Sequence, residues 1–266
     1  MVKGVGFLQE GFSIVRIEYL YRYPVKGLNA EALEWTDVEP GACIPWDRAF
    51  ALANGDNGFD PARPEWRPAR TFMCGKNNAR IALLRSNFDP RSGTLAIRAP
   101  DGTGVAANAL YPEGRAEIAA FLTGFLGEEA RGTPRFVHAP GHTFGDKREQ
   151  LISLISLDSL RDYEAKVGGR RHRRRFRANI WFDGAGPWTE LDWVGRDIQV
   201  GGAILRVIQR TSRCAATEVN PESAARDADP VAELRSLYGH SDLGIYAEVL
   251  EGGRFAVGDS IEVMPE

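Results

Sequence analysis

Short runs of β-branched and aromatic residues recur along the whole chain, and many of them stop at turn-forming residues. The clearest are IVRIEYLY at 14–21, DRAFALAN at 47–54 and RFRANIWF at 175–182. Runs of this length and composition are typical of β-strands. Glycine contributes 29 of the 266 residues and proline 15, a supply that suits many tight turns. The pattern therefore predicts a fold built mainly from short strands.

Further strands are predicted where the same composition returns between turn residues. We expect one strand that stops at Pro40-Gly41, two strands around a loop at 89–93, a strand or hairpin broken at Gly201-Gly202, and two strands around Gly252-Gly253. These strands lie in the segments 32–41, 80–102, 197–210 and 243–263.

Three segments have the features of helices. The apolar residues of 111–127 follow the period of an α-helix. A second helix is predicted after Ser156 or Asp158, either of which would cap it, and it would stop at Gly168-Gly169. A short third helix is expected at 230–239, with proline at its first position. Together these elements predict an α+β protein, mainly β, with a barrel-like sheet and a few peripheral helices.

Charge and hydropathy exclude several classes of protein. Lys and Arg number 33 against 36 Asp and Glu, a net charge of -3, which argues against a nucleic-acid binder. The longest apolar stretch, LISLISL at 151–157, is too short to span a bilayer, and the N-terminus has no signal-peptide core. The three cysteines lie far apart without a C-x-x-C motif. We therefore expect a cytoplasmic protein with no nucleic-acid or membrane partner.

Common catalytic motifs are missing from the sequence. It has no Walker P-loop, no G-x-G-x-x-G and no G-x-S-x-G. His138 and His142 are four residues apart, but Pro140 and Gly141 between them prevent a helix from presenting both, so no zinc site is expected.

Cys214 has the sequence context that most favours chemistry. It lies in QRTSRCAATEVNP directly after a predicted strand, and loops at strand ends commonly carry functional residues. Arg213 and Arg210 favour its thiolate, the form that binds metals and attacks electrophiles. The alternative is a small buried apolar side chain. Cys43 and Cys74 lack such a context, and structural roles are expected for both.

Several cationic residues lie in or beside predicted strands, where a charge that leaves water needs an anionic partner. Arg177 falls within a predicted strand, where either a bound phosphate or carboxylate or an internal salt bridge would satisfy it. Lys26 and Arg48 lie at strand edges, although Asp47 offers Arg48 a local ion pair. We expect Lys26, Arg48, Arg177 and Arg213 to converge on one pocket that holds an anion.

The basic run RRHRRR at 170–175 is a different case. Such a run can contact nucleic acid or other anions, but it is more often a solvated surface, and the negative net charge of the chain favours that interpretation. We expect an exposed loop with no role in the anion pocket.

Five segments occur together in a fixed order. They are YPVKG at 23–27, PGACIPWDRAFAL at 40–52, RFRANI at 175–180, RCAATEVNP at 213–221 and LGIYAEVLEGGRFAVGDSIEV at 243–263. In them the chain resembles the MOSC family, named for the C-terminal domain of molybdenum cofactor sulfurase, and its first half resembles the β-barrel domain that often precedes MOSC. The resemblance implies two domains, over 13–135 and 136–264, and the Pro/Gly-rich segment 135–148 is the expected junction.

The resemblance implies a site for molybdenum cofactor, Mo-molybdopterin, in which the dithiolene of a pterin phosphate binds molybdenum. Cys214 matches the family's cysteine, which ligates molybdenum in the reductases and carries persulfide sulfur in the sulfurases. A soft thiolate suits such a metal. The positions that match the family's cofactor-binding residues are Lys26, Arg48, Arg177, Asn179, Arg213 and Cys214.

Three features depart from the family pattern. Gly27 stands where relatives often have Ser, so one hydrogen bond to the phosphate is expected to be missing. Ala178 replaces the usual Pro of F-R-P-N, and TFGDKREQ at 143–150 replaces a small hydroxyl pair of the reductases.

The resemblance favours an oxidoreductase that reduces N-hydroxylated small molecules at molybdenum, with Cys214 as the catalytic ligand. The alternative is a sulfur-carrier or cofactor-delivery protein in which Cys214 bears a persulfide, and a third is a MOSC scaffold that binds another anionic ligand. The family is also associated with pyridoxal phosphate, but we expect no aminotransferase-like domain before the barrel and no ferredoxin-like domain after it. We therefore expect an external electron-transfer protein or a cysteine desulfurase as partner.

Overall fold

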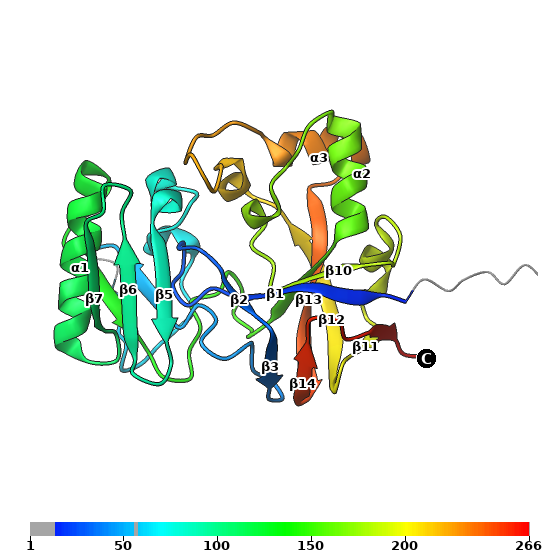
Figure 1. The fold of residues 1–266 in the computed structure, drawn as a ribbon, viewed down its shortest axis with the longest axis horizontal. Coiled ribbons are helices and arrows are strands. Elements are labelled where there is room, and N and C mark those ends of the chain that lie inside the picture. Colours follow the sequence, from blue (N-terminus) through cyan, green and yellow to red (C-terminus); the bar gives the residue numbers. More distant parts are fainter. Residues whose placement is uncertain (1–13, 56–57, 266) are drawn as a thin grey trace, which may run out of the picture.

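The computed structural model describes residues 14–55 and 58–265. Within them, fifteen strands and three α-helices form a large curled sheet and a smaller group of sheets beside it (Figure 1). The described part of the chain is therefore mainly β with a few helices, as the sequence predicts.

The large sheet has eight strands. They are β1 (Arg16–Arg22), β2 (Glu31–Leu33), β9 (Ile152–Ser156), β10 (Ile180–Asp183), β11 (Asp197–Val200), β12 (Ala203–Ser212), β13 (Asp242–Glu251) and β15 (Ile261–Val263). Their order is β15-β11-β12-β13-β9-β10-β1-β2, and only β9 and β10 are parallel neighbours. Ile17 N donates to Asp259 O over 3.0 Å and Ile261 N donates to Val15 O over 2.9 Å. These bonds bring β1 next to the segment that leads into β15 and curl the sheet into a barrel.

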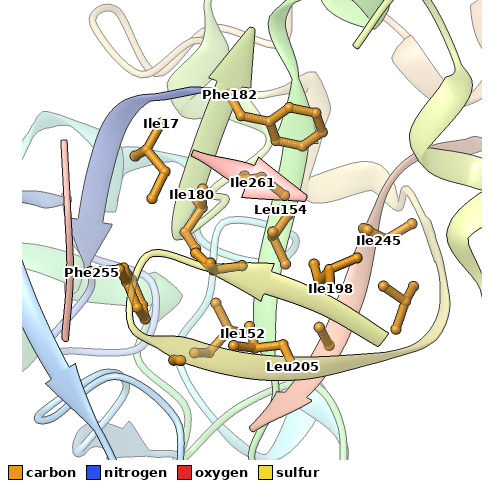
Figure 2. Close-up of a cluster of buried hydrophobic side chains, with 14 of the residues drawn as sticks. Ile17, Ile152, Leu154, Ile180, Phe182, Ile198, Leu205, Ile245, Phe255 and Ile261 are labelled. Atoms are coloured by element: carbon orange, nitrogen blue, oxygen red, sulfur yellow. The ribbon is translucent and has the colours of Figure 1, made fainter. Parts of the chain in front are cut away.

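Apolar side chains fill the inside of this barrel (Figure 2). Ile152 and Leu154 come from the same face of β9, since alternate residues of a strand point the same way. They meet Ile180 of β10 and Ile245 of β13, and all four are fully buried. Each such side chain contributes about 1.5–3 kcal/mol by leaving water. The barrel is therefore a packed core, and a ligand site has to lie at its rim.

The smaller group of sheets belongs to the first half of the chain. It consists of β5 (Arg85–Asp89), β6 (Thr94–Arg98) and β7 (Gly104–Asn108) in one sheet, β4 (Phe50–Ala53) paired with β8 (Arg135–His138), and α1 (Pro112–Leu126). The predicted helix at 111–127 is confirmed by α1, which buries Ile118 and Leu122. They pack with Phe50 and Phe88 in a second core.

The two halves share strands. β1 and β2, although early in the chain, belong to the large sheet, and β3 (Trp35–Val38) pairs with β14 (Gly253–Ala256). The segment expected as a junction, 135–148, begins with the strand β8 and becomes irregular only after His138. The domain bounds 13–135 and 136–264 stay a prediction.

The other two helices match the sequence closely. α2 (Leu157–Val167) starts after Ser156, whose Oγ accepts a 3.1 Å hydrogen bond from Asp158 N, and it stops at Gly168 with φ 72°. α3 (Pro230–Tyr238) begins at its proline. Both helices lie at one end of the barrel (Figure 1). No helix in residues 14–55 or 58–265 is both long enough and apolar enough to cross a membrane.

Three strand predictions need correction. The segment 32–41 contains parts of two strands, β2 and β3, because the chain leaves one sheet and joins another at Glu34. The segment 243–263 contains three strands instead of two. Arg177 lies before β10 and not inside a strand, since a tight turn over 173–175 delays the strand to Ile180 and leaves Arg177 with φ 53°.

Candidate functional site

One cleft gathers most of the residues that the sequence singles out. Its walls come from segments 23–30, 74–85, 174–177 and 211–221, and its volume is ≈ 1240 Å³ with the solvent-open mouth included. Lys26, Arg48, Arg177, Arg213 and Cys214 all line it. The four predicted cations thus meet in one pocket at the rim of the barrel, together with the predicted cysteine.

The lining of this cleft is strongly basic. Seven cationic side chains and a single carboxylate line it among the residues that the structure describes. The cations are Lys26, Arg48, Arg85, Arg174, Arg175, Arg177 and Arg213, and the carboxylate is Asp146. Because the whole chain carries a net charge of -3, this concentration of positive charge is local. Such a cleft attracts anions and focuses the field on them.

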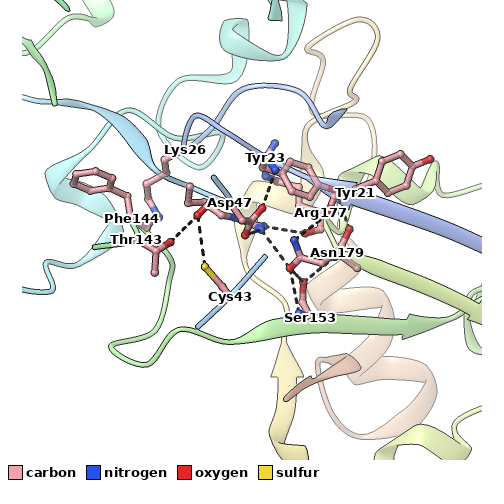
Figure 3. A network of polar contacts seen from close by, with 12 residues as sticks. Tyr21, Tyr23, Lys26, Cys43, Asp47, Thr143, Phe144, Ser153, Arg177 and Asn179 are labelled. Carbon is pink, nitrogen blue, oxygen red and sulfur yellow. Dashed lines mark hydrogen bonds and ion pairs between the residues drawn. The ribbon is translucent and has the colours of Figure 1, made fainter. Parts of the chain in front are cut away.

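Arg48 and Arg177 share one aromatic ring. The guanidinium carbon of each lies 4.4 Å from the centroid of the Tyr23 ring (Figure 3 labels Tyr23 and Arg177). Tyr23 is almost fully buried, its hydroxyl donates to Ala178 O over 3.1 Å, and burial raises its pKa to about 12. The neutral Tyr23 ring therefore makes cation–π contacts with both guanidinium groups. Sequence reasoning missed Tyr23, although it begins the YPVKG segment.

Arg48 has its charge balanced inside the protein. Its guanidinium forms an ion pair with Asp47 and donates to Arg177 O over 3.0 Å. Burial alone would lower the pKa of Arg48, but the adjacent Asp47 carboxylate raises it above its ordinary value. The structure therefore contains the local ion pair between Arg48 and Asp47 that the sequence left open as an alternative.

Arg177 differs, because it forms no ion pair with any carboxylate in the described part of the chain. It donates to Leu28 O over 2.6 Å, and its backbone has φ 53°, a conformation that non-glycine residues rarely adopt. Burial lowers its pKa to about 10, and the nearby Arg48 charge adds to that effect. An internal salt bridge therefore does not satisfy Arg177.

Lys26 is buried with a partner from far along the chain. Its ammonium donates to Phe144 O over 2.9 Å and to Asp146 Oδ1 over 2.6 Å. Desolvation by the surrounding cleft walls alone would raise the pKa of the Asp146 carboxylate, but Lys26 lowers it below its ordinary value. The segment 143–150, where the sequence departs from the family pattern, thus supplies a carboxylate to the cleft.

Arg213 and Thr211 come from the end of β12 and the residue after it. Arg213 Nη1 donates to Phe176 O over 2.9 Å and Nη2 donates to Leu243 O, while burial lowers the pKa of the guanidinium. Arg213 Nε and the buried Thr211 Oγ1 have no hydrogen-bond partner among the described residues. Two polar atoms of the cleft wall therefore have unused hydrogen-bonding capacity.

Cys214 is an exposed free thiol at the start of a tight turn over 215–218. Its carbonyl accepts from Thr217 N and from Thr217 Oγ1, both over 2.9 Å. Arg226 donates to Ala215 O over 3.0 Å on the same turn and to Lys76 O over 2.7 Å on the facing loop. The cysteine therefore stands on a turn that is fixed from two sides.

Asn179 lies beside the cleft and not in its wall. Only 1% of the residue is exposed, and its Oδ1 accepts from Ser153 Oγ over 2.8 Å and from Arg48 over 3.4 Å (Figure 3). Its Nδ2 donates to Tyr21 O over 3.2 Å. Both ends of the amide are thus bonded within the protein, and its oxygen accepts from Arg48.

The basic run at 170–175 is not the uniform exposed loop that the sequence predicts. Arg175 is only 6% exposed, forms an ion pair with Asp227 and donates to Glu218 O over 2.8 Å. Arg174 and Arg175 both line the cleft. The interpretation was wrong because the partners of Arg175 lie some fifty positions later and contribute no local signal.

The other two cysteines differ from each other. Cys74 is buried and lines the same cleft as Cys214, which its sequence context did not indicate. Cys43 lies near Asp47 O and Gln150, and burial raises its pKa to about 12. At neutral pH Cys43 is therefore a thiol and not a thiolate.

Gly27 explains one departure from the family pattern. Its φ of +90° is unfavourable for other residues, and a Cβ there would lie 2.8 Å from Ile81 Cδ1 and 3.2 Å from Met73 O. A serine at this position would require the loop to move. The backbone conformation of this loop therefore explains why position 27 carries no serine hydroxyl.

Comparisons with known proteins agree with this architecture. Residues 14–129 match the MOSC N-terminal beta barrel domain, and residues 139–262 match the MOSC domain. The two matches together span most of the chain, which belongs to the MOSC family in the arrangement where a barrel domain comes first.

Similar proteins include one with a stated activity. The chain is 24% identical to mitochondrial amidoxime-reducing component 1 of Homo sapiens, over 93% of this chain and 82% of that protein. It is 27% identical to the Mus musculus protein of the same name, over 42% of this chain and 36% of that protein. The YuaD protein from Bacillus subtilis is similar in structure over 94% of both chains, with a TM-score of 0.45 and 17% identity.

Proposed function

We propose that this protein binds molybdenum cofactor in the cleft and reduces N-hydroxylated small molecules with electrons from a separate protein. Its place in the MOSC family and its similarity to a protein named for amidoxime reduction support the proposal. The observation that carries it is an exposed cysteine in one cleft with Arg177 and Arg213, two arginines that are not paired with carboxylates of the described residues.

The electrostatics of the cleft fit an anionic group such as the pterin phosphate. Burial lowers the pKa of both Arg177 and Arg213, which means that their charges are poorly solvated. A desolvated guanidinium is costly unless an anion compensates it. A phosphate offers bidentate acceptors for these groups, and Thr211 Oγ1 and Arg213 Nε have unused hydrogen-bonding capacity in the same wall.

Each candidate residue then has a distinct role. Arg177 and Arg213 bind the phosphate, while Lys26 and Arg48, each paired with a carboxylate of the chain, complete the wall of the same cleft. Asn179 acts through Arg48, as a positioning residue. Cys214 offers the soft sulfur ligand that suits molybdenum.

When bound, the cofactor supplies a metal that accepts oxygen and exchanges two electrons. The overall reaction consumes two electrons and two protons, breaks the N–O bond, forms an N–H bond and releases water. The chain orients the substrate between the cleft walls. Tyr246 lines the cleft with Cys214, and its phenol can donate a hydrogen bond to the substrate oxygen.

Exposure of Cys214 also supports a second candidate function. An accessible thiol next to Arg213 can receive sulfur from a cysteine desulfurase and carry it as a persulfide. In that case the basic cleft would hold the cofactor only during delivery or sulfuration.

An activity assay separates the two functions. Protein from a host that makes the cofactor is mixed with benzamidoxime and a reduced viologen dye, and the amidine product is quantified. We expect turnover with this protein and none with protein from a host that cannot make the cofactor. Absence of turnover, combined with cyanide-releasable thiocyanate after incubation with a desulfurase, would favour the sulfur carrier.

A further inference from the structure

Two of the seven cations in the cleft have no role in the proposed cofactor site. Lys26, Arg48, Arg177 and Arg213 are assigned to the cofactor, and Arg175 is occupied by Asp227 and the carbonyl of Glu218. Arg85 and Arg174 remain. Both are exposed, and neither forms an ion pair with a carboxylate in residues 14–55 or 58–265.

Arg85 is fixed on the wall that the first half of the chain provides. It begins β5, and its Nη1 donates to Ala82 O over 2.7 Å and to Leu84 O over 3.0 Å. These bonds hold one edge of the guanidinium against the backbone. Its Nε and Nη2 make no hydrogen bond with the described residues, and Arg85 lines the cleft.

Arg174 lies on the wall that the second half provides, between two residues that are held in place. Arg173 lies over the Tyr19 ring at 3.9 Å and donates to Tyr21 Oη over 3.0 Å, while Arg175 is paired with Asp227. Within the described residues the guanidinium of Arg174 makes no hydrogen bond and no ion pair. Its backbone is thus anchored on both sides, and its charge is free.

The lining near these arginines is apolar. Ile81 and Ala82 precede Arg85, and Phe176 follows Arg174 by two positions. Leu28 and Val219 also line the cleft. A ligand that satisfies both kinds of surface has an apolar body and an anionic end.

We propose that Arg85 and Arg174 bind a carboxylate or phosphate carried by the substrate itself, so that the preferred substrates are N-hydroxylated compounds with an apolar body and an acidic group. This inference rests on the proposed function, because it names the substrate class for the same cleft. Guanidinium groups form charge-assisted, often bidentate hydrogen bonds with both anions. The two sources of negative charge are compared directly in the test.

The test uses matched substrates on cofactor-loaded protein with a reduced viologen dye as electron donor. Benzamidoxime, its 4-carboxy derivative and its 4-phosphate ester derivative share one reacting group and one ring. We expect a kcat/KM about tenfold higher for at least one acidic compound than for the neutral one. The preference should shrink with added salt, because salt screens exposed charges.

Arg85→Gln and Arg174→Gln are each expected to lower the ratio of kcat/KM, acidic over neutral, about tenfold. Arg91→Gln removes the same charge from an exposed loop outside the cleft and should leave the ratio unchanged. The ratio measured for the parent identifies carboxylate or phosphate as the better group. Equal ratios in the parent and both cleft variants would overturn the inference.

Calorimetric binding of the 4-carboxy compound keeps this inference separate from the proposed function. If no compound is turned over, the proposed reaction fails, but binding that weakens in Arg85→Gln and Arg174→Gln still supports an acidic ligand. If both variants have a reduced turnover rate with a protein electron donor but the parent's rate with the dye, the two arginines bind an acidic protein partner. The inference is then wrong.

Discussion

Lys26 Nζ donates a 2.6 Å hydrogen bond to Asp146 Oδ1, although 120 positions separate the two residues. Asp146 is the one carboxylate among the described residues of the cleft wall. It lies next to a cation that is assigned to the cofactor, and an anion bound near Lys26 would be repelled by it. Asp146 is therefore an internal competitor for any anionic ligand of Lys26.

Replacing Asp146 with Asn should strengthen anion binding. The substitution removes the competing charge and leaves Lys26 free to pair with the ligand. Because the Asp146 side chain is 63% exposed, solvent weakens its effect, and we expect inorganic phosphate to bind with a Kd about threefold to tenfold lower, on the order of 1 kcal/mol.

Calorimetric titration of the cofactor-free protein with phosphate measures this effect. Asp192→Asn removes a similarly exposed carboxylate outside the cleft, one that pairs with Arg210, and serves as the control. Weaker phosphate binding in Asp146→Asn would show that Asp146 holds Lys26 in its binding position instead of competing for it.

Replacing Arg177 with Gln should remove the cofactor without unfolding the chain. Arg177 is a poorly solvated cation with no carboxylate partner in the described residues. Its removal therefore relieves the unfavourable desolvation free energy of this charge in the folded protein. We expect cofactor content to fall at least tenfold, while the Tm of the cofactor-free variant at pH 8 is not lower than that of the parent. Circular dichroism and pterin fluorescence measure the two properties.

The pH dependence of stability tests the same residue. The pKa of Arg177 is lowered to about 10 in the folded protein, whereas the unfolded chain keeps the higher ordinary value of an arginine. Between these values the unfolded state binds more protons, so folding gains stability as pH rises above 10. The free energy of unfolding of the cofactor-free parent, relative to Arg177→Gln, should therefore increase from pH 10 to 12. A decrease would show that the folded state stabilises the charge.

The three cysteines should react at different rates. Cys214 is exposed, Cys74 is buried, and Cys43 has a pKa of about 12 because of burial. Iodoacetamide at pH 8 should alkylate Cys214 first, which peptide mass spectrometry would show.

Cys214→Ala should abolish N-hydroxyl reduction, whereas Cys43→Ser should keep near-full activity per bound molybdenum. Equal rates per molybdenum in Cys214→Ala and the parent would exclude a catalytic role for this cysteine.

Arg226 should act as a positioning residue for Cys214. Its guanidinium ties the turn after Cys214 to the loop that contains Lys76, through Ala215 O and Lys76 O. We expect Arg226→Gln to change the alkylation rate of Cys214 and the electron paramagnetic spectrum of bound molybdenum, with Arg226→Lys intermediate. Arg235→Gln, an exposed arginine of α3, should change neither property. An unchanged spectrum in Arg226→Gln would leave Arg226 with a structural role only.

The sequence predicts most of the strands and all three helices, because periodicity and turn residues are local signals, whereas the convergence of the four cations is expected from their need for an anionic partner and from the family resemblance. Five of the six candidate site residues line the cleft, and Asn179 lies beside it. What the sequence could not indicate depends on long-range pairing. Asp146 meets Lys26 from 120 positions away, and Tyr23 contacts Arg48 and Arg177 only after three segments have folded together.

The backbone also limits what the sequence can predict. Arg177 adopts a φ of 53°, which no propensity favours for arginine, and the run at 170–175 includes a buried member whose partner follows much later. The residues around Cys74 in the sequence are those of an ordinary buried cysteine. Only the fold brings Cys74 to the cleft that Cys214 also lines.

The central claim is that this basic cleft binds molybdenum cofactor. Its most direct test is the molybdenum and pterin content of protein purified from a cofactor-competent host, measured by elemental analysis and by fluorescence of the oxidised pterin. We predict equal and near-stoichiometric amounts in the parent, and loss of both in Arg177→Gln. Protein that is free of molybdenum and pterin, although folded and made in such a host, would contradict the claim.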